Sequence, residues 1–144
     1  MPRPRQYDPD AVLDAAQRAF QARGYEATSV QDLVEATGLS RSSLYHAFGD
    51  KHALFLAVLD RYAAAGDEAA EAACCGASPL AAIEAVLTQS AASDRCLMVN
   101  AAAERGGRDP ETAARADAAR QALDRRFELL VRQAQADGDV APER

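Results

Sequence analysis

The segment that decides the fold runs from Thr28 to Lys51 and reads TSVQDLVEATGLSRSSLYHAFGDK. Its first half predicts a short helix capped by Thr28, with Gln31 three residues later completing a capping box. Gly38 permits the backbone conformation of a tight turn, and Ser40 can cap a second short helix. Two short helices joined by such a turn predict a helix-turn-helix.

The second short helix carries side chains that suit the reading of DNA bases. In a helix-turn-helix, the second helix lies in the major groove and presents its N-terminal side chains to base edges. Here these side chains are Arg41, Ser42, Ser43, Tyr45 and His46. Arg binds guanine through two hydrogen bonds, Ser donates or accepts, and Tyr and His reach phosphates or bases. The alternative interpretation is an ordinary solvated helix start, since two short helices joined by glycine also occur in proteins that bind no DNA.

The composition of the whole chain favours helices. Of its 144 residues 35 are Ala, whereas Val, Ile and Thr together number only 13. Ala is the best helix former and a poor strand former, so we predict an all-α protein and exclude a β-sandwich or barrel. Leu, Ile, Val and Phe number 26, which is below the share of about a fifth expected of a well-cored globule. We therefore expect a thin hydrophobic core.

Capping and breaking residues predict five further helices, which makes seven in all. The predicted elements are a first helix from Asp8-Pro9 to Gly24, a fourth from Asp50 to Cys75, a fifth from Ser78-Pro79 to Ser93-Asp94, a sixth around Leu97 and Met98 that ends at Gly106, and a seventh from Asp109-Pro110 to Gly138. Helical spacing also predicts one apolar face in each of two later helices. These faces consist of Leu80, Ile83 and Leu87 in the fifth helix and of Leu123, Phe127, Leu130 and Ala134 in the seventh.

Several stretches together resemble the N-terminal domain of the TetR/AcrR family of transcriptional regulators, through about residue 62. They are FQARGY at 20–25, TSVQDL at 28–33, TGLS at 37–40, Leu44-Tyr45, Phe48 and Asp50-Lys51. The stretches CLMVN at 96–100 and DPE at 109–111 resemble the ligand-binding half of the family more weakly. The resemblance implies a three-helix DNA-binding domain in residues 1–50. A long linking helix then leads into a helical effector-binding and dimerisation domain in residues 51–144.

The same resemblance implies roles for single residues in contacts with double-stranded DNA. Arg41, Ser42, Ser43 and His46 match positions where members vary and read bases, and Tyr45 matches a tyrosine that contacts the DNA backbone. Thr28 matches the capping threonine of a helix whose N-terminus approaches a phosphate. Lys51, the only lysine, matches a lysine that touches the backbone.

The N-terminus adds one possible DNA contact to the resemblance, and two other features depart from the family. Arg3 and Arg5 reach phosphates or the minor groove if they act as an N-terminal arm, and otherwise form a solvated tail. Many members carry Gly where this chain has Ser42. Members usually continue with two further helices after the seventh, so the resemblance implies a shortened form or a different mode of dimerisation.

The function implied by the resemblance is that of a repressor released from a pseudo-palindromic operator by a small hydrophobic effector. The repressor is expected to be a homodimer. Apolar side chains of the later helices are the candidate effector contacts, and each is equally well interpreted as part of the core. These candidates are Tyr62, Ile83, Leu87, Met98 and Phe127.

Two other classes of function are weighed beside this one. A redox-sensing regulator would use Cys74, Cys75 or Cys96, although adjacent cysteines rarely close a low-strain disulfide. An enzyme is not expected, because no nucleophile elbow, phosphate loop or metal-spaced cluster is present. Glu104 and Glu111 are interpreted as isolated, solvated caps. No cofactor or metal is expected.

The charge and the cysteine pattern bear on the partners and the compartment. The net charge of −6 divides into −1 for residues 1–51, with six Lys/Arg against seven Asp/Glu, and −5 for the remainder. The acidity thus belongs mostly to the half that is not expected to touch DNA. Three cysteines without a secretory signal indicate a reduced, cytoplasmic chain. No stretch approaches the roughly 20 apolar residues that span a bilayer, so no membrane partner is expected.

Overall fold

The computed structural model of the chain describes residues 7–76, 78–91 and 96–141. These residues form seven α-helices and no strand, which confirms the predicted all-α class. The helices are α1 (Pro9–Arg23), α2 (Val30–Thr37), α3 (Arg41–Phe48), α4 (Lys51–Cys74), α5 (Pro79–Ala91), α6 (Leu97–Arg105) and α7 (Pro110–Ala136).

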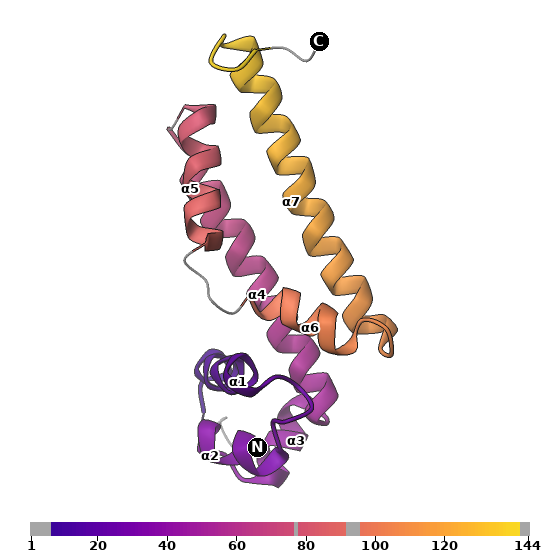
Figure 1. The fold of residues 1–144 in the computed structure, drawn as a ribbon. Coiled ribbons are helices and arrows are strands. Elements are labelled where there is room, and N and C mark those ends of the chain that lie inside the picture. The colour runs from indigo at the N-terminus through magenta and orange to yellow at the C-terminus, as the bar shows by residue number, and fades with distance from the viewer. Residues whose placement is uncertain (1–6, 77, 92–95, 142–144) are drawn as a thin grey trace.

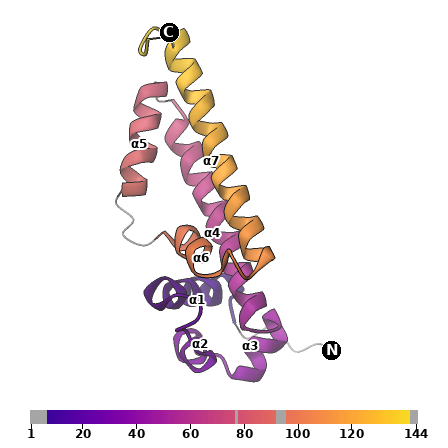
Figure 2. The same ribbon diagram turned by 45° about the vertical axis from the view of Figure 1, so that its right-hand side comes forward.

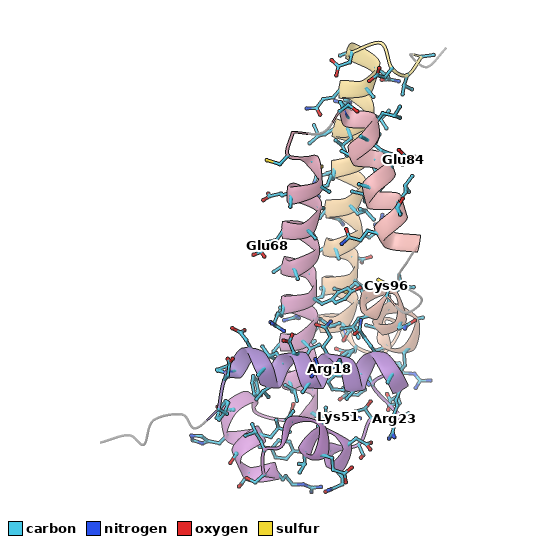
Figure 3. The ribbon with its side chains drawn as sticks, turned by 90° about the vertical axis from the view of Figure 1, so that its left-hand side faces the viewer. Arg18, Arg23, Lys51, Glu68, Glu84 and Cys96 are labelled. Atoms are coloured by element: carbon cyan, nitrogen blue, oxygen red, sulfur yellow. The ribbon has the colours of Figure 1, made fainter. Side chains whose placement is uncertain are left out.

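The helices form an elongated molecule with a small bundle at one end (Figures 1 and 2). We call α1, α2 and α3 the head, and α5, α6 and α7 the body. Helix α4 leaves the head and runs the length of the body, where α5 and α7 both pack against it. The short α6 lies between the head and the long helices of the body (Figure 1). In the side view of Figure 3, α1 carries Arg18 and Arg23 and lies below Cys96, where α6 begins.

Most helix starts follow the predicted local signals. The side chains of Asp8, Ser40, Asp50 and Asp109 accept hydrogen bonds from backbone N–H groups in the first turns of α1, α3, α4 and α7. Such caps satisfy donors that have no partner inside the helix. The predicted break at Ser93-Asp94 lies outside the described residues.

The start of α2 differs from the prediction. Ser29, not Thr28, is the N-cap, and Asp32 rather than Gln31 completes the capping box. Thr28 is fully buried and its hydroxyl donates to the carbonyl of Gly24 at 2.6 Å. The Thr28 hydroxyl is thus bound to the preceding turn inside the protein, and the hydroxyl of Ser29 caps α2 in its place.

The largest buried side chains lie where the head packs on α4. Phe20 of α1 and Phe55 of α4 meet edge to face with ring centroids 4.9 Å apart. Leu33 of α2, Leu44 of α3 and Leu59 of α4 complete this cluster and are each at most 1% exposed. The cluster continues upward into Leu97, Met98 and Ala101 of α6. The head, the base of α4 and α6 therefore share one hydrophobic core.

Helix α5, which lies in the part of the body away from the head, buries its smaller apolar side chains and exposes its leucines. Helix α5 buries Ala82 and Val86, whereas Leu80 and Leu87 are 48% and 54% exposed. The predicted apolar face of α5 is therefore not its packed face. The small side chains let α5 approach α4 and α7, and a face of leucines would hold the helices farther apart.

Helix α7 follows its predicted face only in part. Leu130 and Ala134 are buried, Phe127 is half-buried, and Leu123 is 39% exposed. Two neighbouring apolar residues, Leu129 and Val131, are also exposed. Among the described residues, no helix combines the length and apolarity needed to cross a membrane.

Ion pairs between helices lie on the surface of this bundle. Arg61 of α4 pairs with Asp14 of α1, and Arg115 of α7 pairs with Asp60 of α4 at 2.8 Å. The hydrogen bond from Arg61 lowers the pKa of Asp14. Exposed pairs of this kind contribute about 0–1 kcal/mol each, so the helices are held mainly by the shared core.

Candidate nucleic-acid interface and its junction with the body

Helices α2 and α3 and their turn form the predicted helix-turn-helix. Gly38 ends α2 in the left-handed region, with φ 71° and ψ 6°, and its N–H donates to the carbonyl of Val34 at 3.0 Å. A residue with a Cβ would be strained in this conformation. Leu33 and Leu44 are fully buried and fasten one helix each to the core. The turn and these two anchors hold α3 across the end of the molecule farthest from the upper body (Figures 1 and 2).

The side chains predicted to read bases lie on the outer face of α3. Arg41, Ser42, Ser43 and His46 are exposed and Tyr45 is half-buried. The hydroxyls of Ser42 and Ser43 lie 3.1 and 2.9 Å from the Ser40 hydroxyl. Among the residues that the structure describes, Arg41 has no hydrogen-bond or ion-pair partner. Its guanidinium is therefore available to an acceptor outside the chain.

The other predicted DNA contacts do not share this outer face. Thr28 is fully buried, so its side chain does not reach the surface. The Lys51 ammonium lies 4.2 Å from the centroid of the Tyr25 ring, and burial lowers the pKa of this lysine. Contact of Lys51 with DNA stays a prediction. Arg3 and Arg5 lie outside the described residues.

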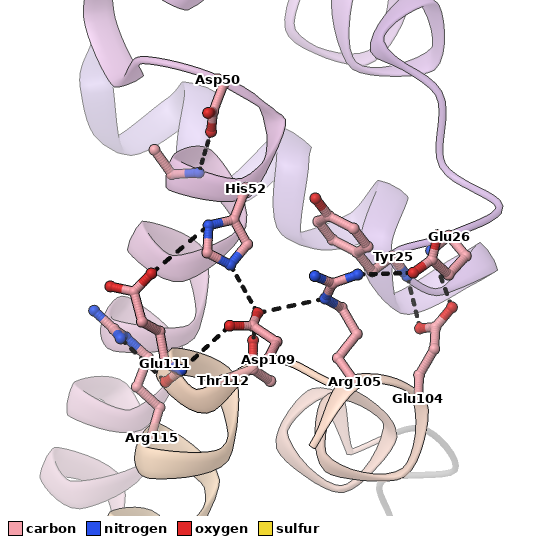
Figure 4. A network of polar contacts seen from close by, with 11 residues as sticks. Tyr25, Glu26, Asp50, His52, Glu104, Arg105, Asp109, Glu111, Thr112 and Arg115 are labelled. Atoms are coloured by element: carbon pink, nitrogen blue, oxygen red, sulfur yellow. Dashed lines mark hydrogen bonds and ion pairs between the residues drawn. The ribbon is translucent and has the colours of Figure 1, made fainter. Parts of the chain in front are cut away.

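A polar junction connects the head to the end of α6 (Figure 4). The Glu104 carboxylate accepts hydrogen bonds from the backbone N–H groups of Tyr25 at 2.8 Å and Glu26 at 2.9 Å. Glu104 is thus no isolated, solvated cap, and that prediction is wrong. Local sequence carries no signal for this contact, because its two partners lie almost 80 residues away along the chain.

Arg105, the next residue, contacts the same turn through its guanidinium. The guanidinium carbon lies 4.0 Å from the centroid of the Tyr25 ring, and one nitrogen pairs with Glu26 at 2.7 Å. The Nε of Arg105 lies 3.4 Å from Asp109. Burial raises the pKa of Tyr25, and two cations, Arg105 and Lys51, lie over its ring. Cations over an aromatic face are attracted by its quadrupole.

Asp109 connects the junction to the base of α4 and the start of α7. Its side chain is 6% exposed. It binds the His52 ring at 2.7 Å and accepts from the Thr112 hydroxyl at 2.5 Å (Figure 4). Burial alone would raise the pKa of Asp109, but the hydrogen bonds from Thr112 and His52 outweigh it and hold the pKa far below the ordinary 3.8. Asp109 is therefore a charged buried group satisfied by its neighbours.

An Asp109→Asn variant is expected to be less stable than the wild type by about 2 kcal/mol at pH 7, because an amide loses the charge-assisted hydrogen bonds. The folded-state pKa is depressed, so the carboxylate stabilises the fold above its ordinary pKa of 3.8 and loses this effect as pH falls below it. Urea unfolding from pH 7 to pH 2.5 measures the difference.

The matched control for this experiment is Asp60→Asn, which removes a surface carboxylate paired with Arg115. It is expected to cost under about 1 kcal/mol. An Asp109→Asn deficit that stays the same size across the whole pH range would contradict the role assigned to the charge of Asp109.

The junction also holds a group of side chains with metal-binding chemistry. Ligand atoms of His52, Asp109 and Glu111 lie within 4.8 Å of one another. However, the imidazole directs opposite nitrogens at the two carboxylates, Nε2 at Asp109 and Nδ1 at Glu111, the latter over 3.9 Å. One ion cannot bind both nitrogens of one ring. In addition, an Asp109 carboxylate oxygen already accepts a hydrogen bond from the Thr112 hydroxyl. The geometry favours a hydrogen-bond network over a metal centre.

The five candidate effector contacts differ in burial, and none of them lines either of the two hollows found among the described residues. Met98 is buried in the shared core, Leu87 is exposed, and Tyr62, Ile83 and Phe127 are half-buried. An open hollow of about 510 Å³ lies between α4 and α7, and none of the five lines it. Its walls include Asp67, Glu71 and Cys74 of α4 and Arg125, Arg126 and Leu129 of α7.

The three cysteines are free thiols. Cys75 is exposed at the end of α4, and Cys74 and Cys96 are half-buried. The Tyr62 hydroxyl lies 3.6 Å from the Cys96 sulfur, where it donates to a thiol. Redox sensing by these residues stays a prediction.

In sequence, the chain is similar to known proteins mainly in its head and the first part of α4. The family model described as "Bacterial regulatory proteins, tetR family" matches residues 12–58. The HTH-type transcriptional repressor ComR of Escherichia coli is 57% identical over 60 residues, which cover 42% of this chain and 29% of ComR. The chain thus matches under a third of the length of this curated relative.

Similarity to solved structures extends along nearly the whole chain. A cysteine mutant of the TetR family transcriptional regulator CifR, in complex with a 26-base-pair operator DNA, is similar with a TM-score of 0.75 and 33% identity. The match covers 99% of this chain and 78% of that one. The regulatory protein TetR from Rhodobacter sphaeroides has the same fold, with a TM-score of 0.84 and 22% identity over 94% of this chain and 76% of its own.

Proposed function

Because the chain belongs to the tetR family of bacterial regulatory proteins, we propose that it is a repressor that binds a double-stranded DNA operator through the outer face of α3. This proposal rests on the exposed outer face of α3, whose opposite side is held in the core by Leu44. The exposed residues are Arg41, Ser42, Ser43 and His46. Tyr45 and Lys51 are proposed to contact the DNA backbone. Because the Thr28 side chain is buried, we propose no direct DNA contact for it. Only the N-terminus of α2, which follows it, would approach a phosphate.

We place the DNA-binding domain at residues 1–50 and the effector and dimerisation domain at residues 51–144. Two copies would present their α3 helices to successive major grooves, about 34 Å apart, on a pseudo-palindromic site. An effector that binds the body and changes the head spacing would alter DNA affinity about 5–150-fold for a coupling of about 1–3 kcal/mol. The apolar side chains of Tyr62, Ile83 and Phe127 favour a hydrophobic effector.

The experiment that tests this function is a selection from random duplexes with the full chain, followed by a mass measurement in solution. Recovery of a two-part palindromic site and a dimeric mass is the expected result. Recovery of no shared motif would overturn the proposal, and a monomeric mass on the selected duplex would overturn its dimeric form.

Replacement of Arg41 is expected to weaken binding to the selected duplex at one base position. Arg41→Ala should cost about 1–3 kcal/mol and relax preference at the base pair that the guanidinium reads. Fluorescence anisotropy on the selected duplex and its single-base variants measures both effects.

The matched control is Arg132→Ala in α7, where the arginine is exposed and its ion pair with Glu128 lies within one helix. This control should leave the affinity and the base preferences unchanged. Equal weakening of binding by the two variants would assign the effect of Arg41 to overall charge instead of base reading.

A further inference from the structure

We propose that Glu104 and Arg105 are positioning residues that set the angle between the head and the body, and thereby the spacing between the two operator half-sites that a dimer accepts. This inference rests on the proposed function. It concerns the junction at the end of α6, which neither the family comparison nor the exposed face of α3 assigns to any role.

The geometry begins with the two ways in which the head is attached. The first is the hydrophobic core, in which α1, the base of α4 and α6 pack together through Phe20, Phe55, Leu59 and Leu97. Hydrophobic contacts of this kind are non-directional. The second attachment is the α6 junction, which consists of hydrogen bonds and an ion pair with defined directions.

The Glu104 carboxylate is seated in a cradle of backbone. One oxygen accepts from Tyr25 and the other from Glu26, so two consecutive N–H groups fix the plane of the carboxylate. Hydrogen bonds to an ionised acceptor are about twice as strong as neutral ones. A Cβ added at Gly24 would lie 2.8 Å from a Glu104 oxygen, so the carboxylate can keep its present position only next to a residue without a side chain.

Arg105 ties the same turn to two further elements. Its guanidinium lies over the Tyr25 ring and pairs with Glu26, while its Nε faces Asp109 at the start of α7. Asp109 in turn binds His52 in the first turn of α4. One corner of the body therefore contacts the turn between α1 and α2 and the base of α4 together.

The position of α3 follows from this arrangement. The turn that Glu104 and Arg105 contact leads directly into α2, and α2 leads through Gly38 into α3. Hydrophobic packing alone, which is non-directional, would leave the head freer to rotate about α4. The second, directional attachment removes this rotation, so in a dimer it would set the distance between the two α3 helices and select one half-site spacing.

The test measures spacing preference with full-length variants Glu104→Ala and Glu104→Gln. The probes are the selected duplex and the same duplex with one base pair added at its centre. The wild type is expected to bind the lengthened duplex about tenfold more weakly, and Glu104→Ala to reduce that ratio to about threefold or less. Preference for bases within each half-site should not change. Glu104→Gln, which keeps one acceptor oxygen, should lie between the two.

The matched control is Glu128→Ala, which removes an exposed carboxylate from α7 and should keep the wild-type ratio. Folded Glu104 variants that keep the wild-type ratio would overturn the inference. Equal weakening on both duplexes would also overturn it, because a purely stabilising contact predicts that result.

A second measurement needs no DNA. The Tyr25 and Glu26 amides should exchange with solvent deuterium slowly in the wild type and at least about tenfold faster in Glu104→Ala, while the interior amides of α1 stay protected. Fast exchange at both amides in the wild type would overturn the attachment itself. If the wild type selects no two-part duplex, the proposed function and the spacing role fail together, whereas slow exchange would still establish the attachment.

Discussion

A Phe55→Ala variant is expected to lose about 3–5 kcal/mol of unfolding free energy. Phe55 is 1% exposed and its ring contacts Phe20 at 4.9 Å and Tyr25 at 4.8 Å between centroids. The substitution removes the contact that joins α1, the α1–α2 turn and α4. The surrounding aromatic and leucine side chains are packed against one another, so they can refill only part of the cavity that the substitution leaves.

Urea unfolding followed by circular dichroism measures this loss. A loss of this size is a large share of the roughly 5–15 kcal/mol that stabilises a typical protein. The control is Leu129→Ala in α7, because this leucine is 61% exposed and its truncation should change stability by under about 0.5 kcal/mol. Similar losses in the two variants would contradict the placement of the main core at the junction of the head and α4.

Gly24→Ala is expected to destabilise the fold by about 2–4 kcal/mol, through two separate effects. The backbone at Gly24 has φ 81° and ψ 175°, a region that only glycine occupies without strain. In addition, the new methyl group would lie 2.8 Å from the Glu104 carboxylate and displace it from the Tyr25 and Glu26 amides. Thermal and urea unfolding measure the combined cost.

Gly38→Ala is the matched control for this prediction. Gly38 also has a positive φ, 71°, but no atom lies within 4 Å of an added Cβ, so only a backbone cost of about 1–2 kcal/mol is expected. The displacement effect is isolated by adding Gly24→Ala to a Glu104→Ala background, where its penalty should shrink. An undiminished penalty there would show that Glu104 does not occupy the cradle.

Local signals predicted most of the helix boundaries correctly. Ser40, Asp50 and Asp109 cap the helices that they were expected to cap, because a cap bonds a backbone N–H only two or three residues ahead. The prediction failed at Thr28, where Ser29 offered an equivalent hydroxyl one residue later. Sequence alone could not separate these two hydroxyls, since burial of Thr28 depends on the packing of α1.

The candidate DNA-reading residues could be proposed from sequence because they occupy consecutive positions of one short helix. Capping at Ser40 and the apolar Leu44 together orient that helix, and the structure leaves Arg41, Ser42 and Ser43 exposed. The effector contacts are different. Tyr62, Ile83 and Met98 come from three helices, and periodicity within each helix carries no information about which faces meet.

By itself, the sequence determined the helical class and the boundaries of most helices, because propensities, caps and turn glycines act over a few residues. Its motifs also carried the resemblance to the family. Only the tertiary structure decided which face of α5 is buried and where Glu104 and Arg105 bind. Leu80 and Leu87 look like a packed face in sequence, yet Ala82 and Val86 are buried because close helix approach favours small side chains. Glu104 meets Tyr25 across almost 80 residues, and contacts over such separations depend on how the whole chain packs.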